Sequence, residues 1–363
     1  MQIRSLTLKD FTVFAEAGLK FSPGLNVLIG ANGTGKSHLL KVLYSVVRPM
    51  MSTRANGTAN TEFRVRLGHA MLDKLLGTFR ATSDNGPLGS LIRHGEETAT
   101  VDLQGDFGAV GIDMNRQLAT TRLPKGKLPT DPSVFVPATE MLSSFEGFIA
   151  AYEHRELPFD ETFRDLCVAL SGTPLRKPSS TGLGKIATTL EDAVGGKTRL
   201  RDGKFFVSLS KDWLLEASML AEGLRKLASI AHLIRNGSLV EKGILFWDEP
   251  EANMNPQLIP AVAQVLLGLA GERIQIFAAT HDYLLTNELS VAVEYGTPKG
   301  LAAKPRFFCL GRSKPREPVT VECGDTLADL QHNPILEEFA AHYDREQALF
   351  NQSGAQVGEG DHS

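Results

Sequence analysis

The sequence has no long apolar run, few cysteines and little excess charge of either sign. Its 363 residues include 3 cysteines, which are far apart and fit neither a disulfide framework nor a zinc site. Apolar stretches such as "AVAQVLLGLAG" (261–271) are too short to cross a bilayer, and "MQIRSLTLKDF" lacks the core of a signal peptide. A net charge of −4 gives no general attraction to nucleic acid or acidic membranes. These absences predict a cytoplasmic protein with no membrane partner.

A glycine-rich segment near the N-terminus carries the clearest chemical signal. "NVLIGANGTGKSHLLKVLYSVVRP" (26–49) has an apolar strand, a P-loop pattern and a helix with helically spaced apolar residues, which Pro49 is expected to end. The loop's backbone N–H groups would surround a polyphosphate, Lys36 would reach the β- and γ-phosphates, and Ser37 would bind Mg²⁺. The alternative is a glycine-rich turn that binds nothing. The predicted nucleotide-binding residues of this loop are Gly30, Asn32, Gly33, Thr34, Gly35, Lys36 and Ser37.

Two adjacent acids far along the chain suit the same site. In "GILFWDEPEANMNPQ" (243–257), residues 243–247 read as a buried parallel strand, with Asp248 and Glu249 at its end. Asp248 would serve Mg²⁺, whose charge relieves the repulsion between the acids, and Glu249 would activate the attacking water. The alternative is an acidic turn after a strand.

Two more segments follow the same logic. "FAATHDYLL" (277–285) reads as another buried strand that ends at His281, where ligands of open α/β sheets bind. "SMLAEGLRKLASIAHLIRNG" (218–237) has helical apolar spacing, with Glu222 and Gly223 at the helix start, where free N–H groups can bind an anion. The alternatives are a structural histidine and an ordinary amphipathic helix.

These segments, in this order, resemble the ABC-type ATPases. The likeness is greatest to the AAA-family ATP-binding proteins of the RecF, structural-maintenance-of-chromosomes (SMC) head and overcoming-lysogenization-defect group. "MQIRSLTLKDFTVFAEAGLKFSPGLNVLIGANGTGKS", "DEPEANMNPQ" and "ATHDYLL" are similar to their opening strands with Walker A, their Walker B with D-loop, and their switch-histidine loop. "SVFVPATEMLSSFEGF" (133–148) looks like the segment that carries their Q-loop.

The resemblance implies a role for each matching residue. Glu249 would be the catalytic base and His281 the switch, Asn253 would lie in a D-loop at a dimer interface, and Glu140 would stand at the Q-loop glutamine's place. Two positions depart from the pattern. Ala221 replaces the signature serine, so N–H groups near Gly223, together with Arg225, are expected to compensate, and Glu140 is not a glutamine.

The implied fold is an α/β P-loop NTPase of the ABC-ATPase head type, with a mixed central sheet, flanking helices and a large inserted α+β subdomain. We expect the first half of the ATPase core at 1–50, an inserted lobe at 51–215 that includes 133–148, the second half at 216–350, and a disordered tail at 351–363. Phe11 and Phe14 are candidates for adenine stacking, although core packing explains them as well.

The predicted function is a slow, Mg²⁺-dependent ATPase that forms a dimer on binding ATP and acts as a switch or sensor for a separate effector, with bacterial antiviral defence as the suggested setting. The alternatives are a RecF-like DNA-repair ATPase and a non-hydrolysing, ATP-gated scaffold. Nucleic acid is a candidate partner because basic residues gather in the insertion, although solvated loops would also explain them. These residues are Arg116, Arg122, Lys125, Lys127, Arg176, Lys177, Lys197, Arg199, Arg201 and Lys204.

Overall fold

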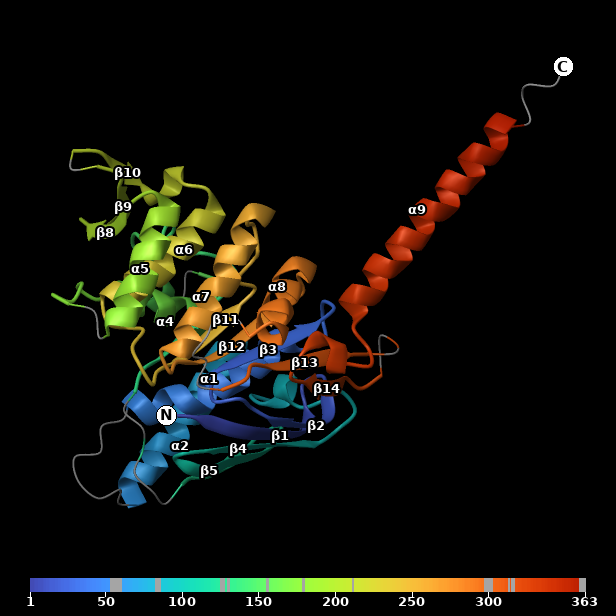
Figure 1. The fold of residues 1–363 in the computed structure, drawn as a ribbon. Helices are drawn as coiled ribbons and strands as arrows, with labels where there is room; N and C mark the ends of the chain where they lie inside the picture. Colours follow the sequence, from blue (N-terminus) through green and yellow to red (C-terminus); the bar gives the residue numbers. More distant parts are fainter. Residues whose placement is uncertain are drawn as a thin grey trace.

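A six-stranded sheet forms the centre of the computed structural model (Figure 1). Its strand order is β14-β13-β3-β12-β11-β7, and all neighbours are parallel except β13 and β14. The strands are β3 (Leu25–Gly30), β7 (Ser133–Val136), β11 (Ile244–Asp248), β12 (Gln275–Thr280), β13 (Arg306–Gly311) and β14 (Thr320–Gly324). The structure describes residues 1–52, 61–81, 86–124, 128, 131–154, 157–177, 180–210, 212–296, 303–312, 314 and 317–358.

Both faces of this sheet are covered, which explains why β3, β7, β11 and β12 are buried along their whole length, whereas the edge strand β14 is partly exposed. Alternating side chains divide the core in two: Phe246 and Phe277 belong to one cluster, and Trp247 and Ala278 to the other. The first cluster includes α1 (Lys36–Ser52), α2 (Thr61–Phe79) and a five-stranded antiparallel sheet. That sheet has the order β2-β1-β4-β5-β6, from Phe14–Lys20, Ile3–Phe11, Thr98–Gly105, Gly108–Asn115 and Ala119–Arg122.

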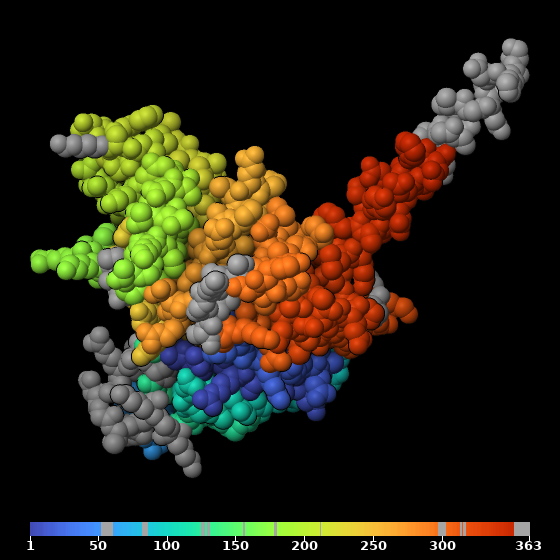
Figure 2. Space-filling model, in the orientation of Figure 1, coloured from blue at the N-terminus to red at the C-terminus, as the bar shows by residue number. Residues whose placement is uncertain are grey.

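The second cluster packs helices from the insertion and from the C-terminal half against the other face. These helices are α3 (Phe148–Glu153), α4 (Glu161–Leu170), α5 (Thr181–Val194), α6 (Glu222–Arg235), α7 (Ile259–Gly271) and α8 (Tyr283–Glu294). A small sheet of β8 (Lys197–Arg201), β9 (Lys204–Ser208) and β10 (Leu214–Glu216) lies beyond α5 and α6. A tight turn at Asp202-Gly203 joins β8 to β9, and Figure 2 shows this part of the molecule standing away from the remainder.

Two expectations about helix ends were wrong. Pro49 does not end α1, which continues to Ser52. The lost hydrogen bond lies near the helix end, and burial of Val46, Val47 and Met50 outweighs it. The last helix, α9 (Pro334–Gly358), runs past Phe350 into the segment expected to be disordered and extends away from the body (Figures 1 and 2). Residues 359–363 of the expected tail lie outside the described residues, as do residues 53–60 and the basic residues Lys125 and Lys127.

Phe11 and Phe14 are fully buried, and Phe11 packs edge-on against Phe79. Of their two interpretations, core packing is therefore confirmed. Among the helices in the described ranges, none is both long and apolar enough to span a membrane.

Candidate nucleotide site

The P-loop joins β3 to α1, as the motif predicted. The Lys36 ammonium donates to the carbonyl oxygens of Gly30 and Ala31, at 2.7 and 3.0 Å, so it lies within the curve of the loop. Burial lowers its pKa, and the carboxylates of Glu249 and Asp248 oppose that shift. A cation held among backbone groups at a helix N-terminus is the arrangement that a polyphosphate requires.

Two glycines of the loop cannot be replaced without a clash. Gly30 has a φ of 153°, and a Cβ there would lie 2.4 Å from the carbonyl oxygen of Leu310. Gly35 has a φ of 91°, and its Cβ would lie 2.6 Å from Val13 Cγ2. The loop path therefore depends on glycine at both positions. Asn32 and Gly33 are exposed, while the Thr34 hydroxyl donates to the Ala31 carbonyl.

Asp248 lies at the end of β11 and meets the P-loop through Ser37. The Ser37 hydroxyl donates to the Asp248 carboxylate, although burial, the larger effect, raises the pKa of Asp248. Within the described part of the chain, the buried Asp248 Oδ1 has no hydrogen-bond partner. A hydroxyl, a carboxylate and an unpaired buried oxygen together fit a Mg²⁺ site, where the ion would neutralise phosphate charge.

Glu249 and His281 contact each other across neighbouring strands. Glu249 Oε1 lies 3.2 Å from His281 Nδ1, and both side chains are partly exposed. β11 and β12 are parallel neighbours, and β12 pairs in turn with β3, so the three strands bring these residues and the P-loop to one edge of the sheet. The sequence predicted each residue separately, and the structure brings them together.

Glu251 is a site residue to which the sequence analysis gave no role. It is 7% exposed, and its Oε1 accepts from the Thr280 hydroxyl at 2.6 Å and from the His281 N–H at 3.4 Å. Burial raises its pKa. Glu251 therefore ties the segment after Asp248 and Glu249 to the backbone of the switch histidine. The signal was present as the third acid of "DEPE", but an acid two residues beyond the candidate base does not reveal its partner.

The signature segment and the D-loop lie together in one chain. Asn253 Nδ2 donates to Glu222 Oε1 at 2.9 Å. A Cβ on Gly223 would lie 2.9 Å from Met254 Cγ, so this glycine allows α6 to begin close to the D-loop. Ala221 precedes α6 and makes no side-chain cap. The helix begins with N–H groups near Glu222 and Gly223, as expected for an anion site.

Glu140 has partners inside the chain. Its Oε1 lies 2.7 Å from Arg225 Nε, and its Oε2 accepts from the N–H of Leu142 at 2.8 Å. Arg225 also donates to the carbonyl of Leu220. The guanidinium that was expected to compensate for the missing signature serine is therefore engaged within its own protomer, where it joins α6 to the Q-loop-like segment.

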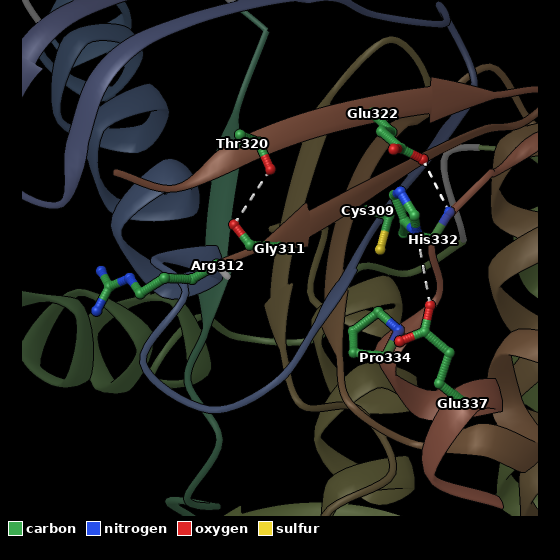
Figure 3. Close-up of a pocket in the computed structure, with 8 residues that line it drawn as sticks. All are labelled: Cys309, Gly311, Arg312, Thr320, Glu322, His332, Pro334 and Glu337. Carbon is green, nitrogen blue, oxygen red and sulfur yellow. Dashed lines mark hydrogen bonds and ion pairs between the residues drawn. The ribbon is translucent and has the colours of Figure 1, made fainter. Parts of the chain in front are cut away.

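A separate pocket of about 250 Å³ lies beside β13 and β14, on the other side of β3 from β11 and β12 (Figure 3). The Glu322 carboxylate accepts from the N–H of His332, and His332 Nδ1 lies 3.8 Å from Glu337. Within the described residues, no group of three or more His, Cys, Asp and Glu side chains could hold a metal ion, so this cluster is not a metal site.

Comparison with known proteins supports the resemblance to the ABC-type and AAA-family ATPases. A family model described as "AAA domain, putative AbiEii toxin, Type IV TA system" matches residues 135–287, and one described as "AAA domain" matches residues 1–96. A solved structure titled "Crystal structure of the SmcHead bound to the C-winged helix domain of ScpA" covers 90% of this chain and 98% of its own, with a TM-score of 0.52 and 15% identity. That identity supports the fold alone.

Curated relatives match shorter segments. The "DNA replication and repair protein RecF" of Magnetococcus marinus is 54% identical over 43 residues, which is 12% of this chain and 11% of the relative. The RecF of Lacticaseibacillus casei is 31% identical over 102 residues, which is 28% of this chain and 26% of the relative. Together these comparisons show that the chain resembles the ABC/AAA-type ATPases of the RecF and SMC-head group.

The predicted resemblance to the ABC/AAA-type ATPases of the RecF and SMC-head group and the predicted fold class are thereby confirmed. The part of the prediction that named the overcoming-lysogenization-defect ATPases stays a prediction, as do the domain boundaries and the roles of individual site residues. Because the RecF matches span about a tenth to a quarter of those relatives, the activity of the whole RecF protein is not transferred with them.

Proposed function

We propose that the chain binds and slowly hydrolyses ATP with Mg²⁺, and that two copies close head-to-tail around two nucleotides. The observation that carries this proposal is the meeting of the Glu249–His281 pair, the Ser37–Asp248 pair and Lys36 at one edge of the sheet. Glu249 would orient and deprotonate the attacking water, with His281 beside it. Mg²⁺, held by Ser37 and Asp248, would neutralise the charge on the phosphates.

The dimer is proposed because the signature and D-loop residues contact one another. Glu222 and Asn253 are paired, and the free N–H groups at the start of α6 have no P-loop contact of their own among the described hydrogen bonds. A second copy would place this helix tip on its partner's nucleotide and so complete each site. Without that copy, the site lacks the donors that the signature supplies.

The test compares Glu249→Gln with Glu16→Gln, an exposed matched control. We expect Glu249→Gln to bind ATP as the unmodified protein does, to lose about 10²–10⁴-fold in turnover, and to accumulate as an ATP-bound dimer in light scattering. Turnover at the unmodified rate would show that Glu249 is not the base. A wild-type dimer that persists without any hydrolysis would favour the scaffold alternative.

A second candidate is a DNA-stimulated ATPase of the RecF type. β8 is an edge strand on which Lys197, Arg199 and Arg201 are all exposed, and the curated relatives are named for DNA replication and repair. Turnover that rises with added DNA, and no longer does so in Arg199→Glu/Arg201→Glu, would favour this function. Turnover that DNA leaves unchanged would count against it.

The role as a switch for a separate effector, with bacterial antiviral defence as its setting, rests on the resemblance. Trapping the dimer with Glu249→Gln and identifying the proteins that co-purify with ATP, but not without it, would test this role. A partner that binds equally well with and without ATP would argue against a nucleotide-controlled switch.

A further inference from the structure

Lys226 is a buried lysine that the proposed chemistry does not yet use. It lies on α6, three positions beyond Gly223, and is 1% exposed. Burial lowers its pKa, while Glu222 and Glu251 oppose that shift. No carboxylate of the described residues lies within ion-pair distance of its ammonium group. A buried ammonium without such a partner is costly, which points to a function beyond packing.

Among the described residues, the ammonium makes one hydrogen bond, and its acceptor belongs to the candidate base. Lys226 Nζ donates to the backbone carbonyl oxygen of Glu249 at 3.1 Å. Glu249 has a φ of 47°, in the left-handed region that residues other than glycine rarely adopt. Such a conformation persists only where the surroundings hold it in place.

The backbone of Glu249 is held on both sides. Its N–H donates to the Ala279 carbonyl at 2.9 Å, within the strand that leads to His281. Its carbonyl accepts from Lys226 on the signature helix. The switch strand and the signature helix therefore hold the two backbone groups of Glu249, with a further turn bond from the Ala252 N–H to the carbonyl at 3.1 Å, and the carboxylate is left directed at His281.

We propose that Lys226 is a positioning residue that links the signature helix to Glu249 of the same protomer. This inference rests on the proposed function. In a head-to-tail dimer, the tip of α6 rests on the partner's nucleotide, and Lys226 lies on the next turn of that helix. When the partner binds ATP, α6 is held in place, and the Lys226 hydrogen bond holds Glu249 in its strained, productive conformation. Each site then becomes active only when the other is filled.

The experiment compares Lys226→Met, which keeps the apolar stem and removes the ammonium, with Lys226→Arg and with the exposed control Lys185→Met. ATP affinity is measured by calorimetry, and kcat and KM are measured by phosphate release. We expect Lys226→Met to lose at least about tenfold in kcat with ATP affinity unchanged within about twofold, because the base loses its orientation while the P-loop is intact. Lys226→Arg should recover part of kcat, and Lys185→Met should match wild type.

The outcomes separate the inference from the proposed function. Wild-type protein that neither binds nor hydrolyses ATP would overturn the proposed function. Active wild type together with an equally active Lys226→Met would overturn the role of Lys226 alone, as would an equal loss of ATP affinity and kcat. If Lys226→Met does not fold, Lys226→Gln replaces the ammonium with an uncharged group on a side chain one bond shorter, and the same split between kcat and affinity is required of it.

Discussion

The two parts of the candidate site differ in what their residues contact. At the edge formed by β3, β11 and β12, Lys36, Asp248, Glu249 and His281 from distant segments converge on one place. Around α6, the predicted residues pair with each other, as Glu222 does with Asn253. In the proposed function, the first part binds phosphate within one chain. The second part contacts the other copy of the dimer, so it should affect activity only when that copy is present.

The largest expected effect is on the first part. Lys36→Met removes the ammonium group that lies among the P-loop carbonyls, and we expect ATP affinity to fall by about 100-fold or more because no other cation replaces it. Calorimetry measures this change, with the exposed Lys20→Met as control. Equal ATP affinity in both variants would break the comparison, because the β3 edge would then not be the phosphate site.

A change in the second part should leave that affinity intact. Gly223→Val places a side chain against Met254 and over the first N–H groups of α6. We expect the monomer to bind ATP within about threefold of wild type, whereas the ATP-induced dimer and turnover should fall by about tenfold or more, because the donors that complete the partner's site are obstructed. Light scattering and phosphate release measure these effects. A dimer of unchanged stability would show that the tip of α6 does not form the interface.

The site residues also differ in whether the sequence could predict them. Lys36, Asp248 and His281 each follow a buried strand, and parallel strands place their C-terminal ends together, so local patterns were sufficient to predict this edge. The roles of Glu251 and Lys226 depend on contacts between segments that are distant in the chain. A lysine within an amphipathic helix looks like a solvent-exposed residue until Lys226 on α6 is seen to be buried against the Glu249 carbonyl that follows β11. The continuation of α1 past Pro49 likewise depends on the burial of the residues around it, which local sequence rules do not include.

The next effect, on stability, concerns the ion pair that joins α6 to the Q-loop-like segment. Glu140 is 4% and Arg225 15% exposed in their side chains, so breaking their ion pair leaves a buried charge without its partner. We expect Glu140→Gln and Arg225→Gln each to lower the free energy of unfolding by about 3–5 kcal/mol, with a coupling energy of about 1–3 kcal/mol in the double-mutant cycle. Chemical denaturation measures both. Additive single effects would mean that α6 and the Q-loop-like segment are energetically independent.

The smallest expected effect is on the pH dependence of stability, and it comes from a histidine on α1, the helix that follows the P-loop. Burial, with a smaller effect of Lys41, lowers the pKa of His38 on α1 to about 4, and its ring packs against Phe79. The unfolded chain, with an ordinary histidine pKa of about 6.5, binds this proton more readily than the folded chain, so stability is complete above that pH and is lost as the pH falls toward 4. His38→Gln should remove at most about 2 kcal/mol of the stability difference between pH 8 and pH 5. Thermal unfolding at the two pH values measures this, with the exposed His154→Gln as control. If His38→Gln left the stability difference between pH 8 and pH 5 unchanged, His38 would carry its proton in the folded protein at pH 5. The P-loop helix would then be less closely packed at this position than the central sheet beside it.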